Sequence, residues 1–170
     1  LIVRVPPIVD IRVGRHCSQV SNIIRIAAAL IDDDCGRVFL VRKRGTAAFM
    51  QAGGKMDPGE SPLAALVREL AEELNFTPSE NEAKFMGTFS CAAANEPEHL
   101  LEAHLFHVRA VNRQFSPAAE LEEAVWVSVE TAHEMRLAPF TREYVLPIAK
   151  ALRSECQLST HSDISSRLPS

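Results

Sequence analysis

The segment Gly54–Phe76 reads GKMDPGESPLAALVRELAEELNF and joins a turn-rich loop to one amphipathic helix. The loop contains Asp57-Pro58-Gly59, which is typical of tight turns. Ser61 and Pro62 predict the helix start, because serine caps free N–H groups and proline fits the first helical position. Thr77-Pro78 predicts its end. Apolar residues at helical spacing predict one buried stripe, made of Leu63, Leu66, Val67, Leu70 and Leu74.

The helix also brings three carboxylates together away from that stripe. Glu69, Glu72 and Glu73 stand at positions i, i+3 and i+4, which share one helical face. Like charges at this spacing repel one another, and a hard divalent cation converts the repulsion into attraction. Oxygen ligands suit Mg²⁺ or Mn²⁺ better than zinc. Taken alone, however, the same residues also fit a solvated acidic face in which Arg68 pairs with Glu72.

The spacing of the whole segment resembles the Nudix signature G-x5-E-x7-R-E-U-x-E-E-x-G-U, where U is an apolar residue. Eight of the nine specified positions match, from Gly54 through Glu60 and the Arg68-Glu69 pair to Phe76. The exception is Asn75, which stands where the family has glycine. Asparagine is the next most tolerant residue for the left-handed conformation that closes a helix. The resemblance extends over about residues 23–152.

This resemblance implies an α/β/α sandwich with a mixed sheet, whose loop-helix-loop motif holds Mg²⁺ (or Mn²⁺) against a diphosphate. Glu72 and Glu73 match the principal metal ligands, and Glu69 matches a residue that binds metal or activates water. The carbonyl of Gly53 matches a further ligand. The residues that match the structural support of the motif are Gly54, Glu60 and Arg68. Of these, Arg68 matches a residue that orients the catalytic carboxylates.

Residues outside the motif are candidates for substrate contacts and for an additional carboxylate. Lys55 lies in the motif loop and is a phosphate candidate. The basic run Arg42-Lys43-Arg44 could also contact phosphates, and we select Arg42 and Arg44 from it, although a solvated basic turn explains it equally well. MutT-type members place an extra carboxylate before the late Trp strand. Glu120 lies six residues before Trp126, and we prefer it to Glu123.

The rest of the chain predicts strands around the helix and one further helix, which together indicate an α/β domain. Pro147 is expected to kink or split the second helix. We divide the chain into an N-terminal extension (1–22), a Nudix domain (23–153) and a flexible tail (154–170). Gly36 is expected in the turn of the first hairpin. The predicted strands are Ile23–Ile31, Val38–Val41, Phe49–Ala52 (ending at Gly53-Gly54), Phe85–Ala94, Leu100–Val111 and Val125–Val129, and the second helix is Thr141–Leu152.

Composition narrows the functional classes. The 170 residues carry a formal net charge of −4, which argues against a nucleic-acid binder that relies on a basic surface. No apolar run approaches the ~18 residues that span a bilayer. Four scattered cysteines without a C-x-x-C pair favour reduced thiols, as in a cytoplasmic protein. We therefore expect a cytoplasmic enzyme with a small nucleotide substrate and no nucleic-acid or membrane partner, and a homodimer stays open.

The substrate is inferred by elimination among the subgroups that the resemblance brings in. The region Cys91-Ala92-Ala93 lacks the Pro of many ADP-ribose hydrolases and the Tyr of many diadenosine polyphosphate hydrolases. The default is then a nucleoside triphosphate, cleaved to a nucleoside monophosphate and pyrophosphate. Preference for oxidised nucleotides has only weak support. Three alternatives stay open: a non-catalytic nucleotide-sensing Nudix-fold domain, a hydrolase of ADP-ribose or another nucleotide sugar, and a prenyl diphosphate isomerase.

Overall fold

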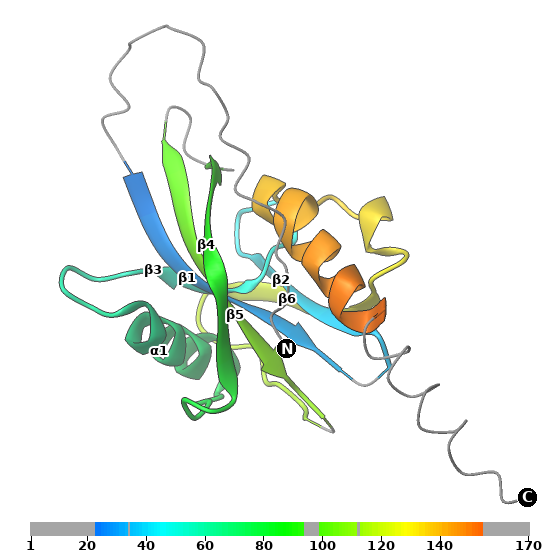
Figure 1. Cartoon of the computed structure of the whole chain (residues 1–170), viewed down its shortest axis with the longest axis horizontal. Coiled ribbons are helices and arrows are strands. Elements are labelled where there is room, and N and C mark those ends of the chain that lie inside the picture. Colours follow the sequence, from blue (N-terminus) through cyan, green and yellow to red (C-terminus); the bar gives the residue numbers. More distant parts are fainter. Residues whose placement is uncertain (1–22, 34, 94–98, 112, 155–170) are drawn as a thin grey trace, which may run out of the picture.

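The computed structural model describes residues 23–33, 35–93, 99–111 and 113–154 (Figure 1). The predicted N-terminal extension and all of the predicted tail except Ser154 lie outside these residues. A C-terminal helix covers 139–154, so Ser154 is helical. The other elements are β1 (Ile23–Asp32), β2 (Arg37–Lys43), β3 (Ala52–Lys55), α1 (Pro62–Leu74), β4 (Ala83–Ala92), β5 (Leu100–Arg109), β6 (Leu121–Ser128) and a 3-10 turn (Ala132–Glu134).

Strand β1 organises a mixed sheet of order β4-β5-β1-β2-β6, with β3 also paired to β1. One edge of β1 pairs in parallel with β5 along its whole length, from Ile23↔Leu100 to Asp32↔Arg109. The other edge is shared. Its residues 26–29 pair with β3, whereas Ile31 and Asp32 pair with β2. Strands β2 and β3 thus pair with successive stretches of the same edge of β1. The sheet divides between these two strands, and β3 lies at the centre of the molecule.

Alternation along β1 builds two cores on opposite faces of the sheet. Ala27, Ala29 and Ile31 belong to the core that also contains the buried residues of α1. Ala28 and Leu30 belong to the core that contains the C-terminal helix. Figure 1 shows these two helices on opposite sides of the strands. Each large buried side chain contributes about 1.5–3 kcal/mol before entropy is counted. The predicted α/β/α sandwich is confirmed.

The ends of α1 agree with the sequence prediction. The Ser61 hydroxyl accepts a hydrogen bond from the Ala64 N–H at 3.2 Å, so Ser61 is the N-cap and Pro62 begins the helix. Asn75 adopts φ 51° and ψ 39°, the left-handed conformation. Its N–H donates to the Ala71 carbonyl at 3.1 Å, and the next N–H, of Phe76, donates to Leu70 at 3.2 Å. Asn75 therefore closes the helix as the missing motif glycine would.

The third strand was predicted three residues too early. It spans Ala52–Lys55, whereas Phe49 and Met50 form only isolated bridges. The two glycines do not end the strand but form its centre. Gly53 has φ 134°, and a Cβ built there would lie 2.2 Å from the Ala27 carbonyl oxygen. Glycine is therefore required for β3 to approach β1 closely enough to pair with it.

Other boundaries also differ from the prediction. Strand β6 begins at Leu121 and not at Val125, β4 begins at Ala83, and β5 ends at Arg109. The C-terminal helix is not split at Pro147, because it continues through that residue to Ser154. The stretch Thr141–Val145 just before Pro147 is π-helical. Among the described residues, no helix is both long and apolar enough to cross a membrane.

Candidate active site

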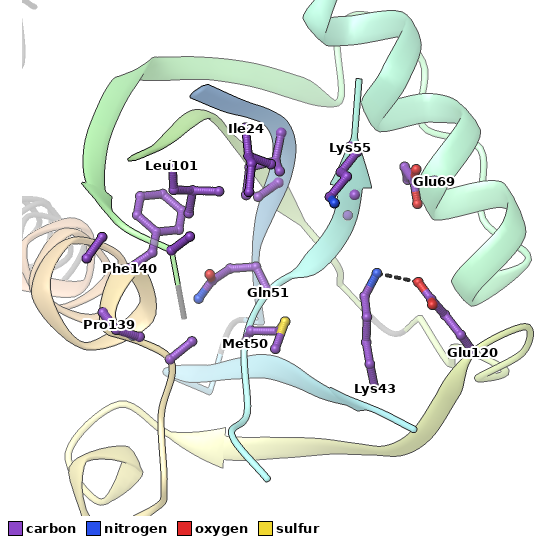
Figure 2. Close-up of a pocket in the computed structure, with 17 residues that line it drawn as sticks. Ile24, Lys43, Met50, Gln51, Lys55, Glu69, Leu101, Glu120, Pro139 and Phe140 are labelled. Carbon is purple, nitrogen blue, oxygen red and sulfur yellow. Dashed lines mark hydrogen bonds and ion pairs between the residues drawn. The ribbon is translucent and has the colours of Figure 1, made fainter. Parts of the chain in front are cut away.

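A cleft of about 460 Å³ connects α1 with the apolar side of the C-terminal helix. Figure 2 shows charged side chains at one end, an apolar wall at the other, and Met50 and Gln51 between them. The charged end contains Lys43, Gly53, Gly54, Lys55, Glu69 and Glu120. The apolar end contains Ile24, Ile26, Ala28, Ala92, Ala93, Leu101, Ala138, Pro139 and Phe140. The volume of the whole cleft lies in the range that is typical of small-molecule binding sites.

Glu73 is the buried carboxylate of the site. It is only 1% exposed, although it belongs to the acidic set of α1. One carboxylate oxygen accepts a hydrogen bond from the Gly53 N–H at 2.9 Å, and the other forms an ion pair with Lys43 Nζ at 2.9 Å. Burial raises the pKa of Glu73 above its ordinary value, and the Lys43 ammonium and the Gly53 N–H only partly oppose this effect.

Lys43 carries the cation that bridges two carboxylates of the site. Its Nζ lies 2.9 Å from Glu73 Oε1 and 2.5 Å from Glu120 Oε1. Burial would lower the pKa of Lys43, but the two facing carboxylates more than offset this, so its pKa lies above the ordinary value. The position follows from strand alternation. Phe39, Val41 and Lys43 share the face of β2 toward α1, and the first two lie in the α1 core.

The backbone around Glu120 holds its side chain near the motif. The preceding residues turn through Ala119, a non-glycine residue with φ 52°. The Ala118 N–H donates to the Glu73 carbonyl at 2.8 Å, and the Arg44 N–H donates to the Glu120 carbonyl at 2.8 Å. These bonds fix the turn against α1 and the end of β2. The Glu120 side chain itself stays 60% exposed.

The other candidate carboxylate, Glu123, faces a different partner. It lies within β6, and its Oε2 accepts from Arg42 Nη2 at 2.9 Å. The same guanidinium donates to Glu122 at 2.7 Å. Neither Glu123 nor Arg42 lines the cleft. The structure thus places Glu120, and not Glu123, beside the carboxylates of α1.

Arg68 ties the motif loop to the helix. Its Nε and Nη2 donate to the two oxygens of Glu60 at 3.0 and 2.9 Å, its Nη1 donates to Glu69 at 2.7 Å, and Nη2 also reaches the Lys55 carbonyl at 3.0 Å. These hydrogen bonds lower the pKa of Glu60 and raise that of Arg68. The alternative Arg68–Glu72 pair is longer, at 3.9 Å. Arg68 therefore braces the loop and orients Glu69.

Gly54 leaves room for a catalytic candidate. A Cβ built on Gly54 would lie 2.4 Å from the carboxyl carbon of Glu69, far inside contact distance. The Glu69 carboxylate therefore occupies the space that any larger residue at position 54 would fill. A larger residue at position 54 would therefore displace the Glu69 carboxylate from its present position.

The donor set suits a hard divalent cation, although its side chains are not gathered as ligands. Within the described part of the chain, no three His, Cys, Asp or Glu side chains converge on one point. Arg68 holds Glu69, Lys43 holds Glu73, and the Glu72 side chain is 57% exposed. The Lys43 ammonium shows that positive charge is stabilised where Glu73 and Glu120 meet. Carboxylates and a backbone carbonyl are the ligands that Mg²⁺ and Mn²⁺ prefer.

The structure separates the candidate phosphate-binding residues. Lys55 lines the cleft, whereas Arg42 and Arg44 do not. From the basic run it is Lys43, the residue that we did not select, that points into the cleft. Strand alternation with Phe39 and Val41 would have singled it out. Gln51 also lines the cleft, and its signal was a polar residue inside the apolar stretch before the motif.

Comparison with known proteins agrees with this geometry. The family model of the NUDIX domain matches residues 23–146. The chain is 32% identical over 123 residues to the CTP pyrophosphohydrolase of Escherichia coli, covering 69% of this chain and 85% of that protein. It is 41% identical over 58 residues to the 8-oxo-dGTP diphosphatase of Haemophilus influenzae, covering 32% of this chain and 43% of that protein.

The fold is similar to that of the MutT protein from Methanosarcina mazei, whose crystal structure matches with a TM-score of 0.63 at 23% identity, covering 80% of this chain and 99% of that chain. The family match covers most of the chain, and Gly54 and Glu69 of the signature line the cleft. The chain therefore belongs to the NUDIX domain family, as the Gly54–Phe76 motif predicts, and is a Nudix hydrolase.

Proposed function

We propose that the protein is an Mg²⁺- or Mn²⁺-dependent pyrophosphohydrolase that cleaves a nucleoside triphosphate to a nucleoside monophosphate and pyrophosphate. The observation that carries this proposal is the polarity of the cleft. Its charged end combines Glu69 of the motif with Glu120, Lys43 and Lys55, and its apolar end is lined by side chains such as Leu101 and Phe140. A nucleoside triphosphate has the same polarity, with an aromatic base at one end and a polyanion at the other.

The two lysines bind the polyphosphate in this orientation. Lys55 lies on the motif strand β3, next to the metal-ligating carbonyl that we assign to Gly53. The Lys43 ammonium is held by two carboxylates, Glu73 and Glu120. If a divalent cation took over these carboxylates, Lys43 would be able to turn its charge to a phosphate oxygen. Both lysines then offset the charge that develops on the departing pyrophosphate.

Glu69, Glu72 and Glu73 would hold the metal together with the Gly53 carbonyl, and Arg68 keeps Glu69 oriented. The bound ion would neutralise phosphate charge and make water a stronger nucleophile. Glu120 accepts the proton of the attacking water, because its exposed carboxylate faces the charged end of the cleft. The water oxygen forms a bond to phosphorus, the P–O bond to the leaving pyrophosphate breaks, and the proton is held by Glu120.

A substrate panel tests the proposal. The purified chain is incubated with the common nucleoside triphosphates, 8-oxo-dGTP, ADP-ribose, dinucleoside polyphosphates and NADH, each with Mg²⁺ and with Mn²⁺. We expect a nucleoside triphosphate to be the best substrate, with monophosphate and pyrophosphate released in equal amounts. The panel includes CTP and 8-oxo-dGTP, which the names of two relatives contain.

Other outcomes identify the alternatives. Faster cleavage of ADP-ribose or another nucleotide sugar would replace the proposed substrate class. Tight nucleotide binding without cleavage in either metal would indicate a sensing domain. Release of inorganic phosphate in place of pyrophosphate would contradict the proposed bond cleavage. Glu73→Gln serves as the control for a contaminating phosphatase, since its loss of activity assigns the reaction to this cleft.

A further inference from the structure

Gln51 is a buried amide at the boundary between the charged and apolar ends of the cleft. It lines the cleft, yet the residue is only 5% exposed. Figure 2 shows its side chain extending from the strand segment before β3 toward the apolar wall of Phe140 and Leu101. A polar side chain so deeply buried is normally satisfied by hydrogen bonds on both its oxygen and its nitrogen.

Only half of this amide is satisfied within the protein. Its Oε1 accepts a hydrogen bond from the hydroxyl of Thr141 at 3.3 Å, and Thr141 is fully buried. Its Nε2 is buried and has no hydrogen-bond partner among the described residues. The amide therefore carries a buried, unpaired N–H donor at a residue that lines the cleft. An unpaired buried donor favours a ligand that supplies an acceptor.

The backbone holds Gln51 rigidly in this position. The preceding residue, Met50, exchanges two backbone hydrogen bonds with Val41 of β2, at 2.8 and 2.9 Å. The residue before that, Phe49, accepts a hydrogen bond from the N–H of Ala138, just before the C-terminal helix, at 2.9 Å. The segment is thus fixed between β2 and the helix that carries Thr141. The orientation of the amide is set by the fold before any ligand enters.

We propose that Gln51 is the base-reading residue of the cleft and selects nucleobases that present a carbonyl oxygen to its Nε2. This inference rests on the proposed function, since it assumes that the base occupies the apolar end. Hypoxanthine, guanine and uracil offer such a carbonyl. Adenine and cytosine place an exocyclic amine at the equivalent ring position, so two donors would face each other. Ile24, Leu101 and Phe140 contact the ring but do not distinguish these bases.

Two nucleotide pairs test the proposal with minimal change of shape. ITP and ATP differ by a carbonyl against an amine on the purine six-membered ring, and UTP and CTP differ likewise on the pyrimidine. For the parent protein, dissociation constants are measured by calorimetry in chelator, and kcat/KM is measured with Mg²⁺. We expect ITP and UTP to be preferred about 10-fold in both readouts.

Three variants assign that preference to the amide. Gln51→Met keeps the side-chain length and should bring both ratios close to one. Gln51→Glu replaces the donor by an acceptor and should reverse them. Thr141→Val releases Oε1 without changing side-chain shape, so the amide can turn over and the ratios should fall. Gln114→Met, at an exposed position, is the matched control and should keep the parent ratios. Thermal unfolding confirms that each variant is folded.

The two readouts separate this inference from the proposed function. If the parent prefers ATP and CTP, or if Gln51→Met keeps the parent ratios, base reading by Gln51 is overturned while hydrolysis stands. If the binding ratios depend on Gln51 but no triphosphate is hydrolysed, the proposed function is overturned and base reading stands. If none of the four nucleotides binds or turns over, both are overturned.

Discussion

The Glu73 carboxylate accepts a hydrogen bond from the backbone N–H of Gly53 at 2.9 Å, and this bond ties the last turn of α1 to the centre of β3. Gly53 in turn pairs with Ala28 of β1, the central strand. A side chain of the catalytic motif is therefore part of the connection between helix and sheet. Its removal should affect both stability and activity.

Replacement of Glu73 by glutamine should destabilise the protein and impair the enzyme. The amide oxygen can still accept from Gly53, but the ion pair with Lys43 is lost and an N–H group faces the ammonium. We expect the free energy of unfolding to fall by about 1–3 kcal/mol, the cost of mismatched buried polar groups. Activity should fall by more than the about 10–100-fold typical of residues that only support metal ligands. Thermal unfolding and kcat/KM measure the two effects, and a fully stable, fully active variant would contradict both.

Glu72→Gln should separate chemistry from stability. The Glu72 side chain is 57% exposed and lies 3.9 Å from Arg68, so its removal costs little in the fold. Stability in chelator should change by less than about 0.5 kcal/mol. A ligand that binds only the folded state raises the unfolding midpoint. Millimolar Mg²⁺ should therefore raise the midpoint of the parent, and raise it less in Glu72→Gln. Equal midpoints with Mg²⁺ and chelator in the parent would argue against a metal site.

The Glu60–Arg68 contact makes stability depend on acidic pH. Hydrogen bonds from Arg68 lower the pKa of Glu60 in the folded protein below its ordinary 4.5. Such a carboxyl stabilises the fold above the unfolded pKa, and the stabilisation is lost as pH falls through the folded pKa. The midpoint difference between the parent and Glu60→Gln should be constant near neutral pH and should shrink below about pH 4.5. Exposed Glu80→Gln is the control, and a difference that does not shrink as the pH falls would refute this linkage.

Asn75 should tolerate glycine and resist branched residues. With φ 51°, glycine fits without strain, and the Asn75 side chain gives up only a 3.5 Å contact with the Ser116 carbonyl. Asn75→Gly should be neutral or slightly stabilising. Asn75→Val should cost about 1–2 kcal/mol, because a β-branched side chain resists the left-handed conformation that asparagine tolerates. Chemical denaturation measures both changes, and a Val variant as stable as the parent would remove the cap interpretation.

The sequence predicted best where structure depends on local chemistry. Ser61, Pro62 and Asn75 act on their own turns of the backbone, so the bounds of α1 could be predicted from the chain alone. The β3 boundary depends on a distant strand. Gly53 looks like a strand terminator until its close approach to Ala27 is known. Likewise Pro147 suggests a kink or a split, whereas the helix continues through it after a π-helical stretch.

The residues of the candidate site also differ in whether the local sequence could predict their contacts. The motif spacing predicted that Arg68 would brace Glu60, because both belong to one local loop-helix unit. Strand alternation indicates which way Lys43 points, but its contact with Glu120 depends on a pairing between β2 and the turn before β6, which the chain order does not reveal. Gln51 required the C-terminal helix as well, since Thr141 orients it. Residues that act through contacts between distant elements could not be assigned from the sequence.

The last prediction concerns Glu120, whose backbone is fixed while its side chain is exposed. The bonds from Ala118 to Glu73 and from Arg44 to Glu120 hold the turn in place, so only the carboxylate can move between Lys43 and the attacking water. If Glu120 accepts the proton, Glu120→Gln should lower kcat by about 10²–10⁴-fold. Mn²⁺ affinity of the free protein should change little, since the α1 carboxylates remain.

Glu123→Gln is the matched control, because this residue has the same charge and lies three positions along the chain, but pairs with Arg42 outside the cleft. The kcat of Glu123→Gln should equal that of the parent. Mn²⁺ titration of each free variant, together with steady-state kinetics, distinguishes the possible roles of Glu120. A loss of Mn²⁺ affinity in Glu120→Gln would make it a metal ligand of the resting enzyme. If Glu120→Gln has the parent kcat and Glu123→Gln has a strongly reduced kcat, then Glu123 and not Glu120 is the residue that accepts the proton. If both variants have the parent kcat, the carboxylates of α1 are sufficient for the reaction.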